Sequence, residues 1–436
     1  MEIYIVQEGD TINSIAEKFG ILLSKLISDN GLVEPYSLVV GQTIVIAYPK
    51  LSYTVQEGDT LQSIADSFQI SVMQLLRNNP ELSNREFIYP GETITISYEN
   101  NKGKFMIIGV AYPYIREDLL KKTLPYLTYL TIFNYRVNKD GQIIESDDDT
   151  EMIRIAKSYG VAPLMLLTTL TAQGTPNMEA VYSILLDQNV QEKYVENILR
   201  ILRTKGLYGI DVTFLYVNIA NLYLYVNLVT LLVNRLHAEG FLVFLTINPK
   251  LEYTDGEITF EKVDYSALEK IADNITFLSY DWGFSIGPPS QISVITTVSF
   301  LEYLVSTMSP ENIGIGMPTL GYNWQLPFIA GFTRANSLNF DSAIALAGQV
   351  NAVIEYDENT SSSYYYYYDI QIIGEPVLHL VWFKDARGIN SSLQKLERYG
   401  LNQTAIWNIM YYFAQMWVVI NSQYEIEKIN NDESLT

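Results

Sequence analysis

An alternation of apolar runs and helical stretches over residues 105–408 restricts the fold of this chain more than any other feature. Eight short segments are rich in β-branched and aromatic residues, and segments with helical spacing separate them. This alternation is typical of βα units around a parallel sheet, and eight units fit a TIM (β/α)8 barrel. The expected strands are 105–111, 129–135, 162–168, 209–215, 242–247, 275–280, 313–317 and 404–408.

The connection between the seventh and eighth expected strands, about 323–403, is unusually long. It contains a helical patch at 341–347 and a strand-like patch at 377–383. We therefore expect an α+β insertion at this place, within a barrel domain that spans 104–430.

Residues 1–99 contain one sequence pattern twice. The segment YIVQEGDT at 4–11 returns as YTVQEGDT at 53–60, and each copy closes with a glycine turn before a β-branched strand. Asp10 and Asp59 are placed to cap a first helix, in which apolar residues recur at helical spacing. These features predict two βααβ modules, 1–49 and 50–99, followed by a polar linker at 98–104.

Both modules resemble the lysin motif (LysM) family. The resemblance implies a shallow groove for N-acetylglucosamine chains between the Gly-Asp-Thr loop and the loop after the second helix. Turn and cap geometry alone would also favour Gly, Asp and Asn at these positions. The glycan contacts that the resemblance implies are Gly9, Asp10, Thr11, Asn30, Gly31 and Leu32, then Gly58, Asp59, Thr60, Asn79, Pro80 and Glu81.

The expected fourth barrel strand carries the residues that bear most on chemistry. Residues 206–217 read GLYGIDVTFLYV. This segment resembles the catalytic strand of family 18 glycoside hydrolases, the chitinase-like family, whose pattern is D-G-x-D-x-D-x-E. On that pattern the three Asp positions fall on Tyr208, Asp211 and Thr213, and the Glu position falls on Leu215.

The resemblance implies that this chain has lost the family's proton donor. In the family the Glu protonates the glycosidic oxygen, while the substrate's own acetamido oxygen attacks the anomeric carbon and the last Asp orients it. Leu215 has no proton to donate and Thr213 carries no charge, so we expect no intact catalytic set. The residual candidates are Asp211, Asp281 and Tyr280, and we interpret Leu215 as an apolar residue that fills the barrel interior.

Later segments extend the resemblance over nearly all of residues 104–420. They read LSYDWG at 278–283, GMPTLGYNW at 316–324, VWFKDAR at 381–387 and IWN at 406–408. The implied sugar cleft would be lined by Tyr280, Trp282, Tyr322 and Trp407. Ordinary core packing is the alternative for each large aromatic residue. Tyr112, Tyr135 and Trp324 are further candidates for the cleft.

Composition excludes several classes of function. The formal net charge is −21, which opposes binding to the phosphates of nucleic acids or to anionic membranes. The chain has no cysteine and two distant histidines, so we expect no cofactor and no metal. No signal peptide and no apolar run of membrane-spanning length is visible.

The paired LysM modules and the chitinase-like barrel together most resemble the spore cortex-lytic N-acetylglucosaminidases of endospore-forming bacteria. Three functions stay open. The first is a non-catalytic protein that binds peptidoglycan- or chitin-type glycans in a spore or cell envelope, made in the mother-cell cytoplasm. The second is an active N-acetylglucosaminidase with an unorthodox acid. The third is a self-assembling coat or crystal protein, for which the tyrosine run at 364–368 would be either an interface or an ordinary β-strand.

Overall fold

The computed structural model describes residues 1–429 except 84, 86, 100, 172, 216, 255–256, 279–290, 330–331 and 370–374, and it describes no side chain at 251–254, 257–258 and 291–297. Within these residues eight parallel strands form a barrel, which closes because β5 pairs with both β20 and β6. The TIM barrel expected from the alternation is confirmed. Its strands are β5 (Lys104–Ala111), β6 (Tyr129–Val137), β8 (Ala162–Thr168), β9 (Gly209–Phe214), β10 (Leu242–Ile247), β13 (Asn274–Phe277), β14 (Ile313–Pro318) and β20 (Gln403–Trp407).

The interior of the barrel is filled at the end where the strands begin. Ile108, Leu164, Phe244 and Ala405 form a buried cluster there, contributed by four different strands. Alternate residues of a barrel strand point inward, so one such layer is enough to close the barrel at this end. Open space is therefore expected at the opposite end, where the strands finish.

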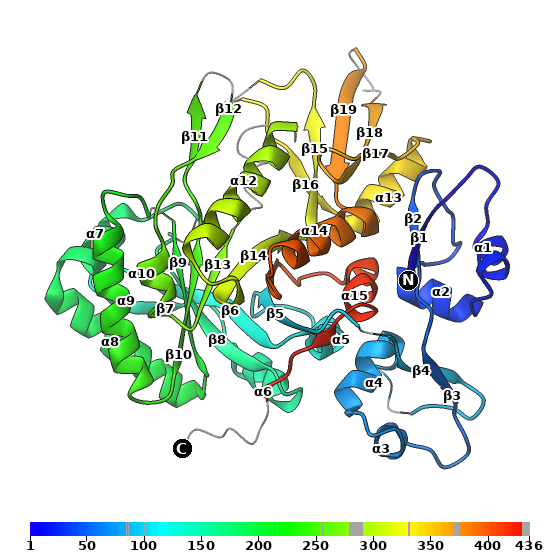
Figure 1. The fold of residues 1–436 in the computed structure, drawn as a ribbon, viewed down its shortest axis with the longest axis horizontal. Coiled ribbons are helices and arrows are strands. Elements are labelled where there is room, and N and C mark those ends of the chain that lie inside the picture. Colours follow the sequence, from blue (N-terminus) through cyan, green and yellow to red (C-terminus); the bar gives the residue numbers. More distant parts are fainter. Residues whose placement is uncertain are drawn as a thin grey trace.

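Helices surround the barrel because each presents an apolar face to the strands (Figure 1). Helix α8 illustrates how their limits are set. The side chain of Asp187 accepts hydrogen bonds from two backbone N–H groups of the first turn, and Gly206 ends the helix in a left-handed conformation at φ 64°. The helices are α5 (Glu117–Thr123), α6 (Thr150–Ser158), α7 (Met178–Leu186), α8 (Gln188–Lys205), α9 (Leu222–His237), α10 (Ser266–Glu269), α12 (Gln291–Thr307), α14 (Ala386–Arg398) and α15 (Ala414–Asn421), with short 3-10 turns η2 (Leu124–Tyr126) and η3 (Pro310–Asn312).

Four further strands extend the barrel domain. Strand β7 (Ile143–Glu145) pairs antiparallel with β6, and β21 (Glu425–Ile426) pairs parallel with β5. A separate hairpin consists of β11 (Leu251–Thr254) and β12 (Glu257–Phe260). Among the described residues, no helix combines the length and the apolar character that a membrane crossing would need.

The insertion between β14 and β20 is a five-stranded antiparallel sheet with one helix. Its strand order is β16-β15-β19-β18-β17. The tyrosine run lies in β18 with tyrosines on both faces: Tyr365 is buried and Tyr366 is half-exposed. The elements are β15 (Leu320–Gln325), β16 (Asn336–Asn339), α13 (Phe340–Gln349), β17 (Glu355–Asp357), β18 (Ser362–Asp369) and β19 (Val377–Phe383).

Each of the two N-terminal modules has the predicted βααβ order. In each module the first and last strands pair antiparallel, and the two helices cover one side of this ribbon. The elements of the first module are β1 (Glu2–Ile5), α1 (Ile12–Phe19), α2 (Leu23–Asn30) and β2 (Thr43–Ile46). Those of the second are β3 (Leu51–Thr54), α3 (Leu61–Ser67), α4 (Val72–Asn78), the 3-10 turn η1 (Pro80–Leu82) and β4 (Thr93–Ser97).

The expectation that Asp10 and Asp59 cap the first helices is wrong by one residue. The caps are Thr11 and Thr60, and each forms a reciprocal capping box with the serine three residues later. Asp10 instead accepts hydrogen bonds from the Tyr4 hydroxyl at 2.7 Å and from a backbone N–H of the same turn at 2.8 Å. The carboxylate therefore fixes the turn before the helix, and the threonine starts the helix.

Helix α15 holds both modules against the barrel (Figure 1). At its first turn, Gln415 is buried, accepts a hydrogen bond from the Thr43 hydroxyl at 2.7 Å and donates to the Thr43 carbonyl at 2.6 Å. At its last turn, Asn421 bonds to the side chains of Arg77 and Asn78 in the second module. Buried polar groups at such a contact must be paired, so this network fixes where the modules sit.

Candidate functional site

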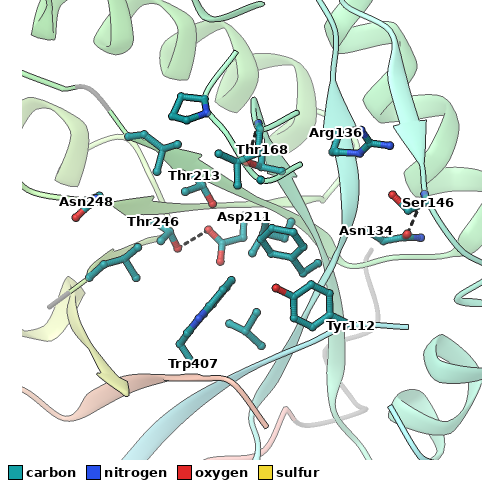
Figure 2. A pocket seen from close by; sticks show the side chains of 18 of the residues that line it. Tyr112, Asn134, Arg136, Ser146, Thr168, Asp211, Thr213, Thr246, Asn248 and Trp407 are labelled. Carbon is teal, nitrogen blue, oxygen red and sulfur yellow. Dashed lines mark hydrogen bonds between the residues drawn. The ribbon is translucent and has the colours of Figure 1, made fainter. Parts of the chain in front are cut away.

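A cavity of about 710 Å³ opens at the ends of the barrel strands, and we call it the barrel cleft (Figure 2). Active sites of TIM barrels lie at this end. Its walls combine aromatic rings with neutral polar groups and few charges, which is the composition of a small-molecule or sugar site. The described lining residues include Tyr112, Phe133, Asn134, Arg136, Ser146, Asp147, Thr168, Asp211, Thr213, Leu215, Thr246, Asn248 and Trp407.

Asp211 lies at the floor of the barrel cleft, on the inward face of β9. Its carboxylate is 3% exposed and accepts hydrogen bonds from the hydroxyls of Thr246 at 2.8 Å and Thr131 at 3.5 Å. Burial raises the pKa of Asp211 to about 6, and these two hydrogen bonds oppose the rise without cancelling it. At neutral pH the group is therefore mostly ionised, at an energetic cost.

Thr213 and Leu215 both line the barrel cleft, as expected from residues that alternate along β9. Figure 2 shows Thr213 close to Asp211 and Thr246 in the wall of the cavity. Leu215 is partly exposed at the end of the strand, so it does not simply fill the interior of the barrel as we expected. Leu215, which the sequence pattern led us to expect at the position of the family's acid, thus faces the cavity with an isobutyl group.

Tyr208 lies far from this chemistry. It is placed before β9 and packs at the filled end of the barrel, against the cluster that contains Phe244. The Lys157 ammonium lies 6.0 Å from the centre of its ring. Tyr208 therefore has a structural environment and is not among the described residues that line the barrel cleft.

The expected cleft aromatics fall into three groups. Trp407 lines the barrel cleft and meets Phe133 edge to face, with ring centres 5.5 Å apart. Tyr322 lies in β15 and is not among the described lining residues, and Trp324 is 1% exposed against Phe328. Tyr280, Asp281 and Trp282 lie outside the described residues. Tyr112 also lines the cleft.

Tyr135 was a further candidate for the cleft, and the alternative of core packing holds for it because β6 contains a bulge. The register of β6 against β8 shifts between Phe133 and Tyr135. The extra residue reverses the inward and outward alternation beyond it. Tyr135 is therefore fully buried outside the barrel lumen, where its hydroxyl donates to Asp149.

The Gly-Asp-Thr loops of the two modules are accessible. Gly9 and Gly58 are exposed in turns with φ of 85° and 88°, and the threonines that follow are exposed at the helix starts. Among the second-loop positions, Gly31 and Glu81 are exposed and Leu32 is half-buried. These parts of the expected grooves can be reached by a ligand.

Asn30, Asn79 and Pro80 are buried in the modules. The Asn30 amide donates to the Leu26 and Val45 carbonyls and accepts from the Val45 N–H, and Asn79 repeats this pattern with Leu75 and Thr95. Each side chain thus ties the second helix to the last strand. A glycan contact at either position would have to come from the backbone.

Several residues that line the barrel cleft were not predicted from the sequence. They are Asn134, Arg136, Ser146, Asp147, Thr168, Thr246 and Asn248. The available signal was the presence of polar residues at the ends of predicted strands, since these ends meet at one face of a barrel. In the part of the chain that is described, no group of three or more His, Cys, Asp or Glu side chains is arranged to hold a metal ion.

The chain resembles known proteins over almost its entire length. The family model described as "Glycosyl hydrolases family 18" matches residues 87–411, and the LysM domain model matches residues 4–47 and 53–97. A Bacillus anthracis protein named cortical fragment-lytic enzyme is 31% identical over 98% of this chain and 99% of its own length. The crystal structure of the Bacillus cereus spore cortex-lytic enzyme SleL superposes with a TM-score of 0.78 at 29% identity, covering 98% of this chain and 99% of that one. A chitinase structure from Chromobacterium violaceum, at 19% identity and a TM-score of 0.63 over 73% of this chain and 98% of its own, shares the fold.

Proposed function

Because this chain belongs to glycosyl hydrolase family 18 and carries two LysM domains, we propose that it binds N-acetylglucosamine-containing glycans of the peptidoglycan type. We further propose that it does so without the hydrolysis typical of the family, as a protein of the bacterial spore envelope. The glycan would contact the exposed loops of the modules and the barrel cleft. We keep the module limits 1–49 and 50–99 and the barrel limits 104–430 as part of this proposal.

The observation that carries the non-catalytic proposal is Leu215 in the wall of an open cavity. A positioned general acid contributes roughly 10²–10⁴ in rate, and a leucine supplies none of it. Thr213, which also faces the cavity, cannot stabilise a developing positive charge as a carboxylate would in a site of low dielectric. We therefore propose that Leu215 and Thr213 stand where the family mechanism uses an acid and a carboxylate, so that neither group is supplied at these two positions.

The barrel cleft still suits the ring and hydroxyl groups of a sugar. Trp407 presents an indole and Tyr112 a phenol ring, and aromatic faces pack well against the C–H surfaces of pyranoses. The hydroxyls of Thr213 and Thr246 and the amide of Asn248 lie around these rings and can hydrogen-bond sugar hydroxyls (Figure 2). These walls of the cavity can therefore hold a sugar ring with Leu215 at the position that we propose for the acid.

A specific finding favours a second candidate function, an N-acetylglucosaminidase with an unorthodox acid. The relatives that match this chain over 98% of its length are named as lytic enzymes. In addition, the pKa of Asp211 is raised to about 6, in the range useful for proton transfer near neutral pH. An acid at the cleft floor would require the substrate to sit deeper than in the family mechanism.

No observation favours self-assembly through the tyrosine run. Three hydroxyls of this run bond within the insertion: Tyr364 donates to Glu355, Tyr365 donates to the Ala343 carbonyl, and Tyr367 accepts from the Asn323 amide. The run therefore has a role inside its own sheet, as the ordinary β-strand interpretation predicts.

Restoring the two missing carboxylates tests the proposed function. Purified wild-type chain and the double variant Leu215→Glu, Thr213→Asp are incubated with peptidoglycan and chitooligosaccharides, and released fragments are measured by mass spectrometry. We expect binding without products from the wild type, and products from the double variant. A triple variant that also carries Asp211→Asn controls for contamination, and its product release should fall at least tenfold, since a charge-assisted contact in the site is removed.

Products from the wild-type chain would establish the second candidate and overturn the non-catalytic proposal. In that case wild type is compared with its Asp211→Asn variant, because loss of activity would identify the unorthodox acid. A wild-type chain that neither binds nor cleaves these glycans would refute both candidates.

A further inference from the structure

The bulge in β6 turns a cationic side chain into the barrel cleft. Thr131 and Phe133 point into the barrel, so regular alternation would bring Tyr135 inward next and send Arg136 outward. The register shift between Phe133 and Tyr135 reverses this order. Arg136 consequently lines the barrel cleft, at the level of Thr168 on the neighbouring strand β8.

The bulge is held on both of its sides. The extra residue, Asn134, accepts hydrogen bonds from the backbone N–H groups of Ser146 at 3.0 Å and Asp147 at 2.9 Å, and donates to the Asp147 carbonyl at 2.8 Å. Tyr135 is fixed by its bond to Asp149, which is itself fully buried. Bulges beside active sites commonly re-aim a side chain, and this one aims Arg136.

Arg136 differs in its electrostatic environment from the arginines of the chain that form ion pairs. Arg154, Arg203 and Arg235 lie on the outer helices, and each pairs with a glutamate. Among the described residues, Arg136 has no carboxylate oxygen within ion-pair distance, and no other lysine or arginine lines the barrel cleft. A half-buried guanidinium that faces a cavity without a partner is available to an anionic ligand.

We propose that Arg136 binds a carboxylate carried by the glycan, so that the barrel cleft selects acidic glycan strands over neutral ones such as chitin. This inference rests on the proposed glycan binding and adds the substrate class to it. The planar guanidinium offers two parallel N–H donors, which match the two oxygens of a carboxylate. Figure 2 shows Arg136 and Ser146 on one side of the cavity and Asn248 on the opposite side, so the carboxylate of a bound glycan would lie on the Arg136 side.

The cleft contains two carboxylates of its own, and their negative charges limit its preference for a glycan that carries a carboxylate. Asp211 is buried at the floor on β9, and strand β8 lies between β9 and the strand of Arg136. Asp147 lines the same side as Arg136 but is exposed to water, which screens its repulsion. We therefore expect the cleft to bind a carboxylate glycan roughly fivefold to tenfold tighter than a neutral one. A fully buried pair of guanidinium and carboxylate would give a larger ratio.

The test measures binding of three matched tetrasaccharides to the full chain by isothermal titration at fixed salt. The first is a peptide-free peptidoglycan glycan whose alternate sugars carry a free lactyl carboxylate. The second is the same glycan with its carboxyl groups reduced to alcohols, and the third is chitotetraose. A fourth ligand, in which peptides occupy the lactyl groups, shows whether the carboxylate belongs to the sugar or to the peptide.

Four variants separate the cleft from the modules. Trp407→Ala disables the barrel cleft, so the binding that it retains reports the LysM modules. Arg136→Gln removes the charge, Arg136→Lys keeps the charge without the two-pronged geometry, and Arg154→Gln controls for net charge on an exposed outer helix. Circular dichroism confirms that each variant is folded before titration.

We expect the cleft component of wild type to bind the carboxylate glycan roughly fivefold to tenfold tighter than its reduced form. Arg136→Gln should abolish this ratio, Arg136→Lys should keep part of it, and Arg154→Gln should keep all of it. A ratio that Arg136→Gln leaves unchanged, or a wild-type ratio of one, would overturn this inference and leave glycan binding standing. If wild type and Trp407→Ala bind every ligand alike, the cleft binds no glycan, and both the cleft part of the proposed function and this inference fail.

Discussion

Replacement of the buried aspartate of the barrel cleft should stabilise the protein by an amount that depends on pH. Asp211 is 3% exposed, and burial raises its pKa from 3.8 to about 6. In the folded state the carboxyl group therefore holds its proton in a pH range where the unfolded chain has already released it. Stability contributed by this group is present below about pH 3.8 and is lost as the pH rises through about 6.

The size of the effect follows from the same two pKa values. A difference of about two pKa units corresponds to about 3 kcal/mol of unfolding free energy once the pH exceeds both. In Asp211→Asn the amide oxygen can still accept the hydrogen bond of Thr246, but no charge is buried. Relative to wild type, the variant should gain about 3 kcal/mol at pH 7 and only about 0.5 kcal/mol at pH 4.

Urea unfolding of wild type and Asp211→Asn between pH 4 and pH 8, followed by tryptophan fluorescence, measures this gain. Asp66→Asn, at an exposed position of α3, controls for the change in net charge. If the gain of Asp211→Asn is the same at pH 4 and pH 7, the carboxylate is not buried as the structure places it. A pKa of Asp211 raised by burial would then be refuted.

Two further predictions concern the contact between the modules and the barrel. Gln415→Ala leaves the hydroxyl and carbonyl groups of Thr43 without this partner, so it should lower the free energy of unfolding by about 2–3 kcal/mol in urea titrations. The control Gln62→Ala, on the exposed face of α3, should lower it by under about 0.5 kcal/mol. Gly41→Ala and Gly91→Ala form a matched pair, since both glycines have φ near 90°. A Cβ at Gly41 would lie 1.9 Å from a backbone oxygen of the insertion, and one at Gly91 would meet no atom within 4 Å. Thermal unfolding should therefore show a loss at least about 2 kcal/mol larger for Gly41→Ala, and equal losses would contradict the docked arrangement of the first module.

The barrel and the modules were predictable because their signals are local. Eight apolar runs predict eight strands, since a strand buried on both faces requires consecutive apolar residues. The repeated Gly-Asp-Thr segment predicts the module twice, since a turn and a helix cap depend on neighbours within four residues. The one-residue error in the cap arose because aspartate and threonine are both good caps, and the contact of Asp10 with Tyr4 decides between them.

The barrel cleft was predictable only in part. The positions of Asp211, Thr213 and Leu215 follow from strand alternation along β9, which the sequence pattern gives directly. Alternation fails on β6, where the bulge moves Tyr135 out of the cleft and Arg136 into it. The bulge depends on the contact of Asn134 with a loop 12 residues further along the chain, and local propensity does not record such a contact.

The sequence by itself thus determined the fold of this protein, its two LysM modules and the absence of a carboxylate at Leu215, because each is written in consecutive or regularly spaced residues. Only the tertiary structure decided how the parts sit together. Gln415 reaches Thr43, 372 positions away in sequence, and holds the first module on the barrel domain, while Asn421 reaches Arg77 and Asn78 and holds the second. The tertiary structure also decided that Asp211 is buried with a raised pKa and that Arg136 faces the cleft. Burial and side-chain direction at these sites depend on residues that come close only when the barrel closes.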